Sequence, residues 1–428
     1  MTQIVRFDKI VPEGKAMGHF ENRAVFAIGP LPGEEAEVRL TRTKKDWAEA
    51  VVTEWVDASA RRGEPFETHY LSCSPWQAVE YDYQLELKRG MLEEIYARPD
   101  LKTAGFRVGE VLASPKQFGY RNKLEFTLWE AGEKGSGRLE LAFHERGSWK
   151  YLKTAAEGCV LGTDGMNTAA IAVVARVNEL DLVGVADTLT VRQSHTHGHV
   201  VTVLLVKEPV ERDWSKLVVP EVTGVVVARK LKHDVLETLW RWGDTNLLET
   251  LGGVNLSYPW DSFFQVNPPA FERALERIMA QVKPGAHVMD LYGGAGTIGL
   301  PVARVAARVV GVEIVESSVN LANLNAAANR IDNYRAIAVA GEKMDPTLLV
   351  GADTVILDPP RAGLHPNVIS MLLEAKPARI IYLSCNPVTQ ARDVTALLGS
   401  YKPHGVVAGF DFYPGTLHLE SLVTLVRK

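Results

Sequence analysis

The stretch Asp290-Leu-Tyr-Gly-Gly-Ala-Gly-Thr-Ile-Gly299 decides the fold, because it joins an apolar strand to a glycine-rich turn. Gly294, Gly296 and Gly299 satisfy the pattern G-x-G-x-x-G, whose glycines let the backbone approach a ligand closely where a helix begins. The strand is expected over residues 287–291, directly before the turn. Such a unit is typical of an α/β sheet that binds ligands at the carboxyl ends of its strands.

The rest of residues 256–428 repeats this alternation and predicts a doubly wound, mostly parallel, Rossmann-like α/β domain. Further strands are expected at 309–313, 336–340, 354–357, 380–383, 406–410 and 422–426. Helical patterns between them include 301–304, 316–329 and 367–374.

The remainder of the chain predicts two further parts. Residues 1–58 contain short alternating strands around the turn GPLPGEE, which favours a small β-barrel of the OB type. Residues 59–255 comprise a connector (59–95), helical from about residue 79 to 96, and a central α+β domain. Within it, residues 116–153 mix basic and aromatic side chains, which is typical of a single-stranded nucleic-acid surface or of a half-exposed sheet. The aromatic residues are Phe118, Tyr120, Phe126, Trp129, Phe143 and Trp149.

Composition narrows the class of protein. The 428 residues carry a net charge of −5 and are 46% hydrophobic, which is ordinary for a globular protein without a globally basic surface. Three scattered cysteines exclude a disulfide framework and favour a reducing compartment. With no signal-peptide or membrane-spanning pattern, we expect a cytoplasmic protein. His195, His197 and His199 could share a strand face but lack a nearby carboxylate or thiolate, so no metal site is expected.

Acidic residues around the glycine turn indicate which ligand it takes. Asp290 would oppose a pyrophosphate, so the turn favours a cationic ligand such as S-adenosylmethionine over a nicotinamide dinucleotide. Glu313 ends the next strand and can accept hydrogen bonds from the ribose hydroxyls of either ligand, so it does not distinguish between them. Asp358 ends the fourth strand before a double proline, which fixes a stiff loop beside the ligand.

Cys385 is the candidate nucleophile, because it follows a strand at the edge where α/β sites are built. A methyltransferase needs a thiolate when the accepting carbon is a weak nucleophile, as carbon 5 of uracil is. Addition of sulfur to carbon 6 activates carbon 5, and a base must later remove its proton. Glu420, just before the last strand, is the candidate base, and His418 is a second one.

These motifs resemble the RNA 5-methyluridine methyltransferases, which use S-adenosylmethionine on tRNA or 23S ribosomal RNA. The matching segments are FFQVN (263–267), DLYGGAGTIGL, GVE, LDPPRAGLHP, YLSCNPVTQARD and FYPGTLHLE, and VFAIGPLPGE in residues 1–58 resembles the family's TRAM domain. GYRNK (119–123) is also similar to the family's central region.

The resemblance implies roles for individual residues. Cys385 matches the nucleophile and Glu420 the proton acceptor. The cofactor positions are Gln265, Asp290, Tyr292, Gly294, Gly296, Thr297, Glu313 and Asp358. The TRAM and central domains would bind RNA, with ribosomal RNA preferred over tRNA, and no obligate protein partner is implied. The target uridine would be flipped out, with Phe263 and Phe264 as candidates to stack near the vacated place.

One departure concerns the iron–sulfur cluster that many TRAM-containing members hold on four cysteines. The equivalent positions here are Glu67, Cys73, Trp76 and Cys159, so no such cluster is expected. Cys73 and Cys159 could still lie close together.

Three alternatives stay open for the activity. One is a uridine-54-type tRNA substrate, another is an RNA cytosine-C5 methyltransferase, and a third is a catalytically idle RNA-binding protein on this scaffold.

Overall fold

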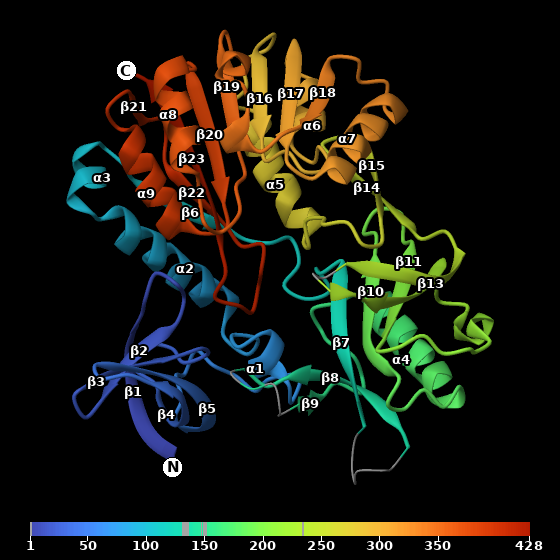
Figure 1. Ribbon diagram of the computed structural model, residues 1–428. Helices are drawn as coiled ribbons and strands as arrows, with labels where there is room; N and C mark the ends of the chain where they lie inside the picture. Colours follow the sequence, from blue (N-terminus) through green and yellow to red (C-terminus); the bar gives the residue numbers. More distant parts are fainter. Residues whose placement is uncertain (1, 131–136, 147, 149–151, 233–234) are drawn as a thin grey trace.

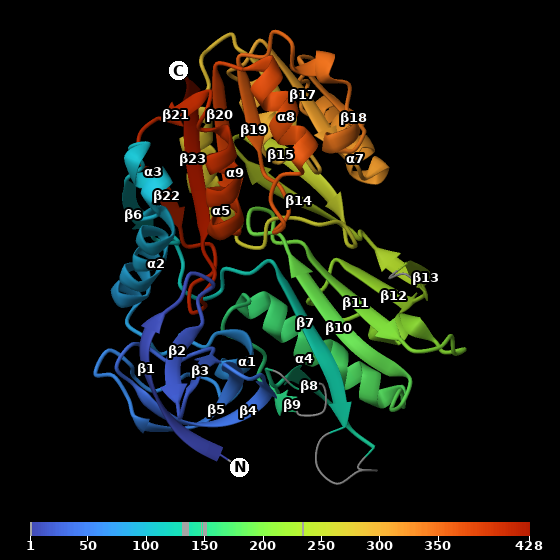
Figure 2. The same ribbon diagram turned by 60° about the vertical axis from the view of Figure 1, so that its left-hand side comes forward.

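The computed structural model describes residues 2–130, 137–146, 148, 152–232 and 235–428. Figure 1 shows a barrel (blue) and a central domain (green) side by side beneath a larger α/β domain (orange and red), and Figure 2 shows the same arrangement after a rotation. Trp149, from the aromatic segment of the sequence, lies outside the described residues. No helix of the described chain is long and apolar enough to span a bilayer.

The N-terminal strands close into a five-stranded barrel of order β1-β2-β3-β5-β4, which confirms the predicted barrel. Alternate residues such as Val5, Phe7 and Val38 point inward and are buried, as expected for strands with one face on a core. The strands are β1 (Thr2–Ile10), β2 (Ala16–Phe20), β3 (Arg23–Ala27), β4 (Glu35–Thr43) and β5 (Trp47–Asp57).

The connector is fastened to the barrel by a buried ion pair. Arg62 donates from Nε to Glu34 Oε1 at 2.7 Å and from a terminal nitrogen to Oε2 at 2.8 Å, and both side chains are almost fully buried. The bidentate geometry fixes both position and orientation. The connector then forms α1 (Tyr70–Cys73), α2 (Tyr81–Tyr96) and α3 (Pro99–Thr103).

The central domain is a seven-stranded sheet of order β13-β12-β11-β10-β7-β8-β9 with α4 packed on one face. Phe126 and Tyr120 are fully buried, whereas Trp129 is 43% exposed. The aromatic segment is therefore partly core and only partly surface. The elements are β7 (Lys123–Glu130), β8 (Leu139–His144), β9 (Leu152–Thr154), α4 (Asp164–Glu179), β10 (Ala186–Gln193), β11 (Val200–Val206), η1 (Trp214–Leu217), β12 (Gly224–Lys230) and β13 (Leu236–Gly243).

A β-hairpin and a helix lead into the large α/β domain. They are β14 (Asn246–Leu251), β15 (Val254–Pro259) and α5 (Pro268–Met279). Asn267 caps α5, its side chain accepting from the amide of Ala270 at 3.1 Å.

The large sheet has the order β18-β17-β16-β19-β20-β23-β22-β6 and is parallel from β18 to β20, which confirms the doubly wound prediction. Its elements are β16 (His287–Leu291), α6 (Gly299–Ala303), β17 (Arg308–Glu313), α7 (Glu316–Ala328), β18 (Tyr334–Ala338), η3 (Gly341–Lys343), η4 (Pro346–Leu349), β19 (Thr354–Leu357), α8 (Pro366–Ala375), β20 (Arg379–Ser384), α9 (Pro387–Leu397), β21 (Tyr401–Pro403), β22 (Val407–Phe410) and β23 (Glu420–Arg427). The edge strand β6 (Val108–Leu112) comes from the segment after α3.

Both faces of this sheet are covered. Met289 and Leu291 of β16 join one core with α8, α9 and α2, whereas Val288 joins the other core with α5, α6 and α7. Period-two alternation explains this division, since successive residues of a strand point to opposite faces. Asp290 therefore lies on the α6 side, directly beneath the glycine turn.

A loop at residues 411–419 joins all parts of the molecule. Lys88 of α2 donates to Asp411 Oδ1 at 2.6 Å, and neither side chain is exposed. Tyr120 of the central domain donates to the Pro414 carbonyl at 3.0 Å, and Gly14 of the barrel packs against Leu417. The loop leads straight into β23.

We predict that Lys88→Met lowers the free energy of unfolding by about 3–5 kcal/mol, because it leaves the Asp411 carboxylate buried without its cation. Arg89→Met is the matched control on the same helix. It removes an exposed pair with Glu93 and should cost at most about 0.5 kcal/mol. Urea denaturation followed by fluorescence measures both, and equal midpoints would contradict the prediction.

Candidate active site

The glycine turn after β16 has the backbone conformation that its sequence requires. Gly294 and Gly296 have φ of +53° and +83°, which side chains disfavour. A Cβ on Gly299 would come within 2.6 Å of the Asp290 carboxylate and 2.7 Å of the Tyr334 ring, so this glycine is needed for packing. Tyr292 itself has φ of +64°, and both Tyr292 and Thr297 are half-buried in the turn.

Acidic groups collect around this turn. Asp290 is 1% exposed, and neither of its oxygens has a hydrogen-bond partner within the described residues. Burial, together with repulsion from Asp358 and Glu313, raises the pKa of Asp290 to about 7. Burial likewise raises the pKa of Asp358 to about 7. Buried carboxyls gathered in this way fit a ligand that carries positive charge.

Glu313 is held in place by backbone amides. Its carboxylate accepts from the amide of Gly294 at 3.1 Å and from that of Val315 at 2.9 Å. It therefore connects the end of β17 to the glycine turn, where the resemblance places the cofactor. The unpartnered hydroxyl of Tyr334 and carboxylate of Asp290 leave buried polar atoms beside the same turn. These features fit a ligand with hydroxyls and a cationic group.

Cys385 follows β20 directly, and its surroundings fix the loop. Asn386 caps α9 by accepting from the amide of Val388 at 3.2 Å. The same side chain donates to the carbonyl of Arg361 at 2.9 Å. Asn386 thus ties the cysteine loop to the Asp358-Pro-Pro-Arg361 loop, which brings the thiol beside Asp358.

Glu420 lies next to Cys385 because of strand register. β20 and β23 are antiparallel and pair Ser384 with Ser421, so the next pair at this edge is Cys385 and Glu420. Burial, followed by the charges of Glu420 and Asp358, raises the pKa of Cys385 to about 11. Burial, reinforced by Asp358, raises the pKa of Glu420 well above its usual range. The thiol of Cys385 is therefore protonated in the free protein at neutral pH, and burial favours the neutral form of the Glu420 carboxyl.

His418 is the second candidate base. Burial, with nearby cations such as Arg361, lowers the pKa of its imidazole to about 4, so the ring is neutral at physiological pH. The ring packs edge-on against Tyr413 at 5.8 Å between centroids. A neutral imidazole could accept a proton, but Glu420 is the group paired with Cys385 by register.

The two phenylalanines in residues 263–267 lie in different environments, one buried and one exposed. Phe264 is 2% exposed and stacks on Tyr258 at 4.0 Å, so its candidacy for stacking on RNA is wrong. Phe263 is 77% exposed and remains available. Phe263 and Phe264 point in opposite directions, and the sequence alone does not predict which of the two is buried in the core. Gln265 is half-buried, and its carbonyl accepts from the side chain of Asn122 at 2.9 Å.

Arg361 is a site residue that sequence reasoning missed. It is exposed, and its charge lowers the pKa of both Cys385 and Glu420. The signal was present, since Arg361 directly follows the double proline of the Asp358 loop.

Comparisons with known proteins identify the family of the chain. The family model described as tRNA (Uracil-5-)-methyltransferase matches residues 252–350 and 350–428, and the TRAM domain model matches residues 2–53. An uncharacterized RNA methyltransferase of Nitratidesulfovibrio vulgaris is 32% identical, covering 100% of this chain and 96% of that protein. Another from Lactobacillus johnsonii is 28% identical, covering 97% and 96%.

A solved structure is similar over the whole chain. The Pyrococcus abyssi tRNA (uracil-54, C5)-methyltransferase, in complex with S-adenosyl-L-homocysteine, superposes with a TM-score of 0.78 at 27% identity. The likeness covers 100% of both chains.

We predict that the affinity for S-adenosylmethionine rises with pH up to about 7, the pKa of Asp290 and Asp358. Below that pH a cation must displace protons from these carboxyls, at up to about tenfold in Kd per pH unit for each proton released. Isothermal titration calorimetry across this range measures Kd and proton release. S-adenosylhomocysteine, which lacks the sulfonium charge, is the control and should show a weaker dependence. A pH-independent Kd for S-adenosylmethionine would contradict the prediction.

Proposed function

The chain belongs to the TRAM-containing, S-adenosylmethionine-dependent RNA uracil-C5 methyltransferases, and from this premise we propose that Cys385 and Glu420 carry the reaction at carbon 5 of a uridine. The observation that carries the proposal is their juxtaposition. The register of β20 and β23 brings a half-buried thiol and a buried carboxyl together at the carboxyl edge of the sheet, near the carboxyl of Asp358.

The first step activates the base. The Cys385 thiolate adds to carbon 6 of uracil, and the electrons of the C5–C6 double bond move onto carbon 5 and the exocyclic oxygen of carbon 4. S-adenosylmethionine supplies the methyl group that carbon 5 takes up.

The second step restores the ring. Glu420 removes the remaining proton from carbon 5, and that electron pair re-forms the double bond while the bond from carbon 6 to sulfur breaks. Cys385 leaves as a thiolate. Glu420 acts here as the ionised carboxylate. It is buried next to Cys385, and its raised pKa makes that carboxylate a stronger base than an exposed one.

In the free protein, the environment of Cys385 keeps its thiol in the protonated, unreactive form. Cys385 is protonated in the free protein because burial and the nearby carboxyls oppose its ionisation. Positive charge added beside Asp358 would offset this repulsion, and Arg361 already lowers the pKa of the thiol. Ionisation of Cys385 is therefore coupled to loading of the site.

RNA recognition is assigned to the barrel and the central domain, with Phe263 at the catalytic domain. A uridine in a duplex or a stacked loop does not expose carbon 6, so it must be flipped out. Phe263 is 77% exposed and can stack against the RNA near the vacated place.

A uridine of 23S ribosomal RNA is the first candidate substrate, since the TRAM-bearing resemblance favours ribosomal RNA. A tRNA uridine is the second candidate. It is favoured by the full-length likeness to the Pyrococcus abyssi enzyme, which acts on uracil 54 of tRNA.

The activity is tested with methyl-labelled S-adenosylmethionine and two RNA pools, ribosomal RNA and tRNA, both from cells lacking 5-methyluridine. We expect label in 5-methyluridine from one pool, and its loss by at least about 10⁴-fold in Cys385→Ala with cofactor binding retained. Val388→Ala, an exposed neighbour on α9, is the matched control and should stay active. Label in 5-methylcytidine, or no label, would refute the proposed reaction.

The role of Glu420 is tested by trapping. We predict that Glu420→Gln still forms the bond to carbon 6 but does not release it, so a protein–RNA adduct survives denaturing electrophoresis. Glu420→Gln combined with Cys385→Ala should give no adduct. If His418→Gln accumulates the adduct instead, and Glu420→Gln turns over normally, the base has been misassigned.

A further inference from the structure

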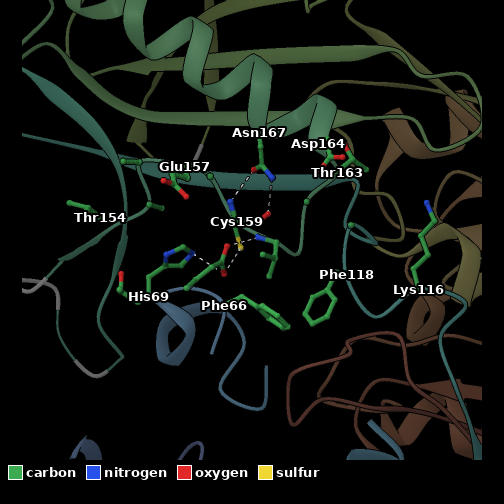
Figure 3. Close-up of a pocket in the computed structure, with 18 residues that line it drawn as sticks. Phe66, His69, Lys116, Phe118, Thr154, Glu157, Cys159, Thr163, Asp164 and Asn167 are labelled. Atoms are coloured by element: carbon green, nitrogen blue, oxygen red, sulfur yellow. Dashed lines mark hydrogen bonds and ion pairs between the residues drawn. The ribbon is translucent and has the colours of Figure 1, made fainter. Parts of the chain in front are cut away.

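Four potential metal ligands meet away from the active site, at the junction of the connector and the central domain. They are Glu67 and His69 before α1, Cys73 at its end, and Cys159 in the loop before α4. One donor atom from each lies within 4.8 Å of all the others. Figure 3 shows His69 and Cys159 meeting at the wall of the adjoining pocket.

These residues do not fit a four-thiolate iron–sulfur cluster. Only Cys73 and Cys159 supply sulfur, and Trp76 is fully buried with an indole that cannot ligate iron. A two-iron centre of the Rieske type needs two cysteines and two histidines, and this group offers one histidine. His69, which no sequence motif indicated, replaces the missing sulfur donors together with Glu67.

We propose that Glu67, His69, Cys73 and Cys159 bind a single divalent zinc ion. Zinc accepts thiolate, imidazole and carboxylate ligands together in a tetrahedron, at about 2.0–2.3 Å from the metal. The donors of such a tetrahedron lie roughly 3.3–3.8 Å apart. Here His69 Nε2 lies 3.3 Å from Glu67 Oε2, and both sulfur atoms lie 4.0 Å from that oxygen. The three printed separations from Glu67 are therefore close to those of a zinc tetrahedron, and all four donors lie within 4.8 Å of one another.

The His69 ring is buried, and its Nε2 is directed at the other members of the group. His69 is 4% exposed, and its Nε2 makes no hydrogen bond within the described part of the chain, although it approaches the Glu67 carboxylate. A buried ring nitrogen without a partner is costly. Coordination to a metal would satisfy it.

A surrounding set of hydrogen bonds holds the ligands in place. Gln77 donates to Glu67 Oε2 at 2.9 Å, and the amide of Val160 donates to Oε1 at 2.5 Å. Asn167 accepts from the amide of Cys159 at 2.9 Å and donates to its carbonyl at 3.0 Å. Outer-shell contacts of this kind are common around metal sites because they orient the ligands.

The site would tie two domains together. Three ligands come from the connector and Cys159 comes from the central domain, so one ion would link parts of the chain 86 residues or more apart. Two thiolates and a carboxylate would also lose their mutual repulsion when a divalent cation lies between them. The proposal is independent of the methylation chemistry.

The experiment measures metal in the full-length protein. The chain is expressed with both zinc and iron in the medium, purified without chelators, and analysed by inductively coupled plasma mass spectrometry. We expect about one zinc ion per chain and no stoichiometric iron. Cys73→Ser and His69→Gln should lose the zinc, and Gln77→Ala should weaken it about 10- to 100-fold. Cys385→Ser, which alters a cysteine outside the group, should retain it.

A second measurement covers variants that fail to fold. Wild-type protein stripped of metal is titrated with Co²⁺ and should develop the visible bands of tetrahedral cobalt with thiolate ligands, which zinc then removes. Stoichiometric iron with labile sulfide would overturn the proposal. So would a metal-free native protein without cobalt bands, or an isolated Cys73–Cys159 disulfide.

Discussion

The buried ion pair between Lys88 and Asp411 is the constraint on which the active site depends. Removing two charges from water is costly, and the direct contact at 2.6 Å compensates for it together with hydrogen bonds from Lys88 to the Tyr413 carbonyl and from the Tyr413 amide to Asp411. Burial lowers the pKa of Lys88, and the charge of Asp411 opposes that shift. The pair fixes where residues 411–419 leave β22, and so where Glu420 enters β23. Asp411 directly follows Phe410, the β22 residue that pairs with Glu420, so the ion pair helps to position the proposed base.

The buried carboxyls of Asp290 and Asp358 impose a second constraint, which lowers the stability of the folded chain. Asp290 and Asp358 have raised pKa values, so their ionised forms destabilise the folded chain at neutral pH. Cores on both faces of the sheet must offset this cost. A cationic ligand would compensate the negative charge of these carboxylates. Their electrostatic cost in the free protein is therefore consistent with a binding site.

Sequence reasoning succeeded where structure is local. The buried parallel strands are nearly continuous apolar runs, so β16 and β19 were predicted to the residue and the others within about two residues. Strand pairings between distant segments could not be predicted from the sequence. Nothing in the sequence places β6 beside β22, or shows that β23 runs antiparallel to β20, although this register brings Glu420 to Cys385. His69 lies within four residues of Glu67 and Cys73, but only the fold brings Cys159, 90 residues away, to complete the group.

The connector is held at three joints, and each one uses buried polar groups. Arg62 and Glu34 fasten it to the barrel, Lys88 and Asp411 to the catalytic domain, and the group around Glu67 to the central domain. Apolar contacts tolerate sliding, whereas a bidentate pair or a set of metal ligands allows one geometry. The angles between the RNA-binding parts and the catalytic edge are therefore specified by charge and hydrogen bonding. The third joint differs from the others because each of its four side chains can bind a metal ion and none of them is a lysine or an arginine. How firmly it holds the two domains together therefore depends on whether an ion is bound there. Loss of an ion there would loosen the central domain while leaving the catalytic sheet, and the pairing of Cys385 with Glu420, unchanged.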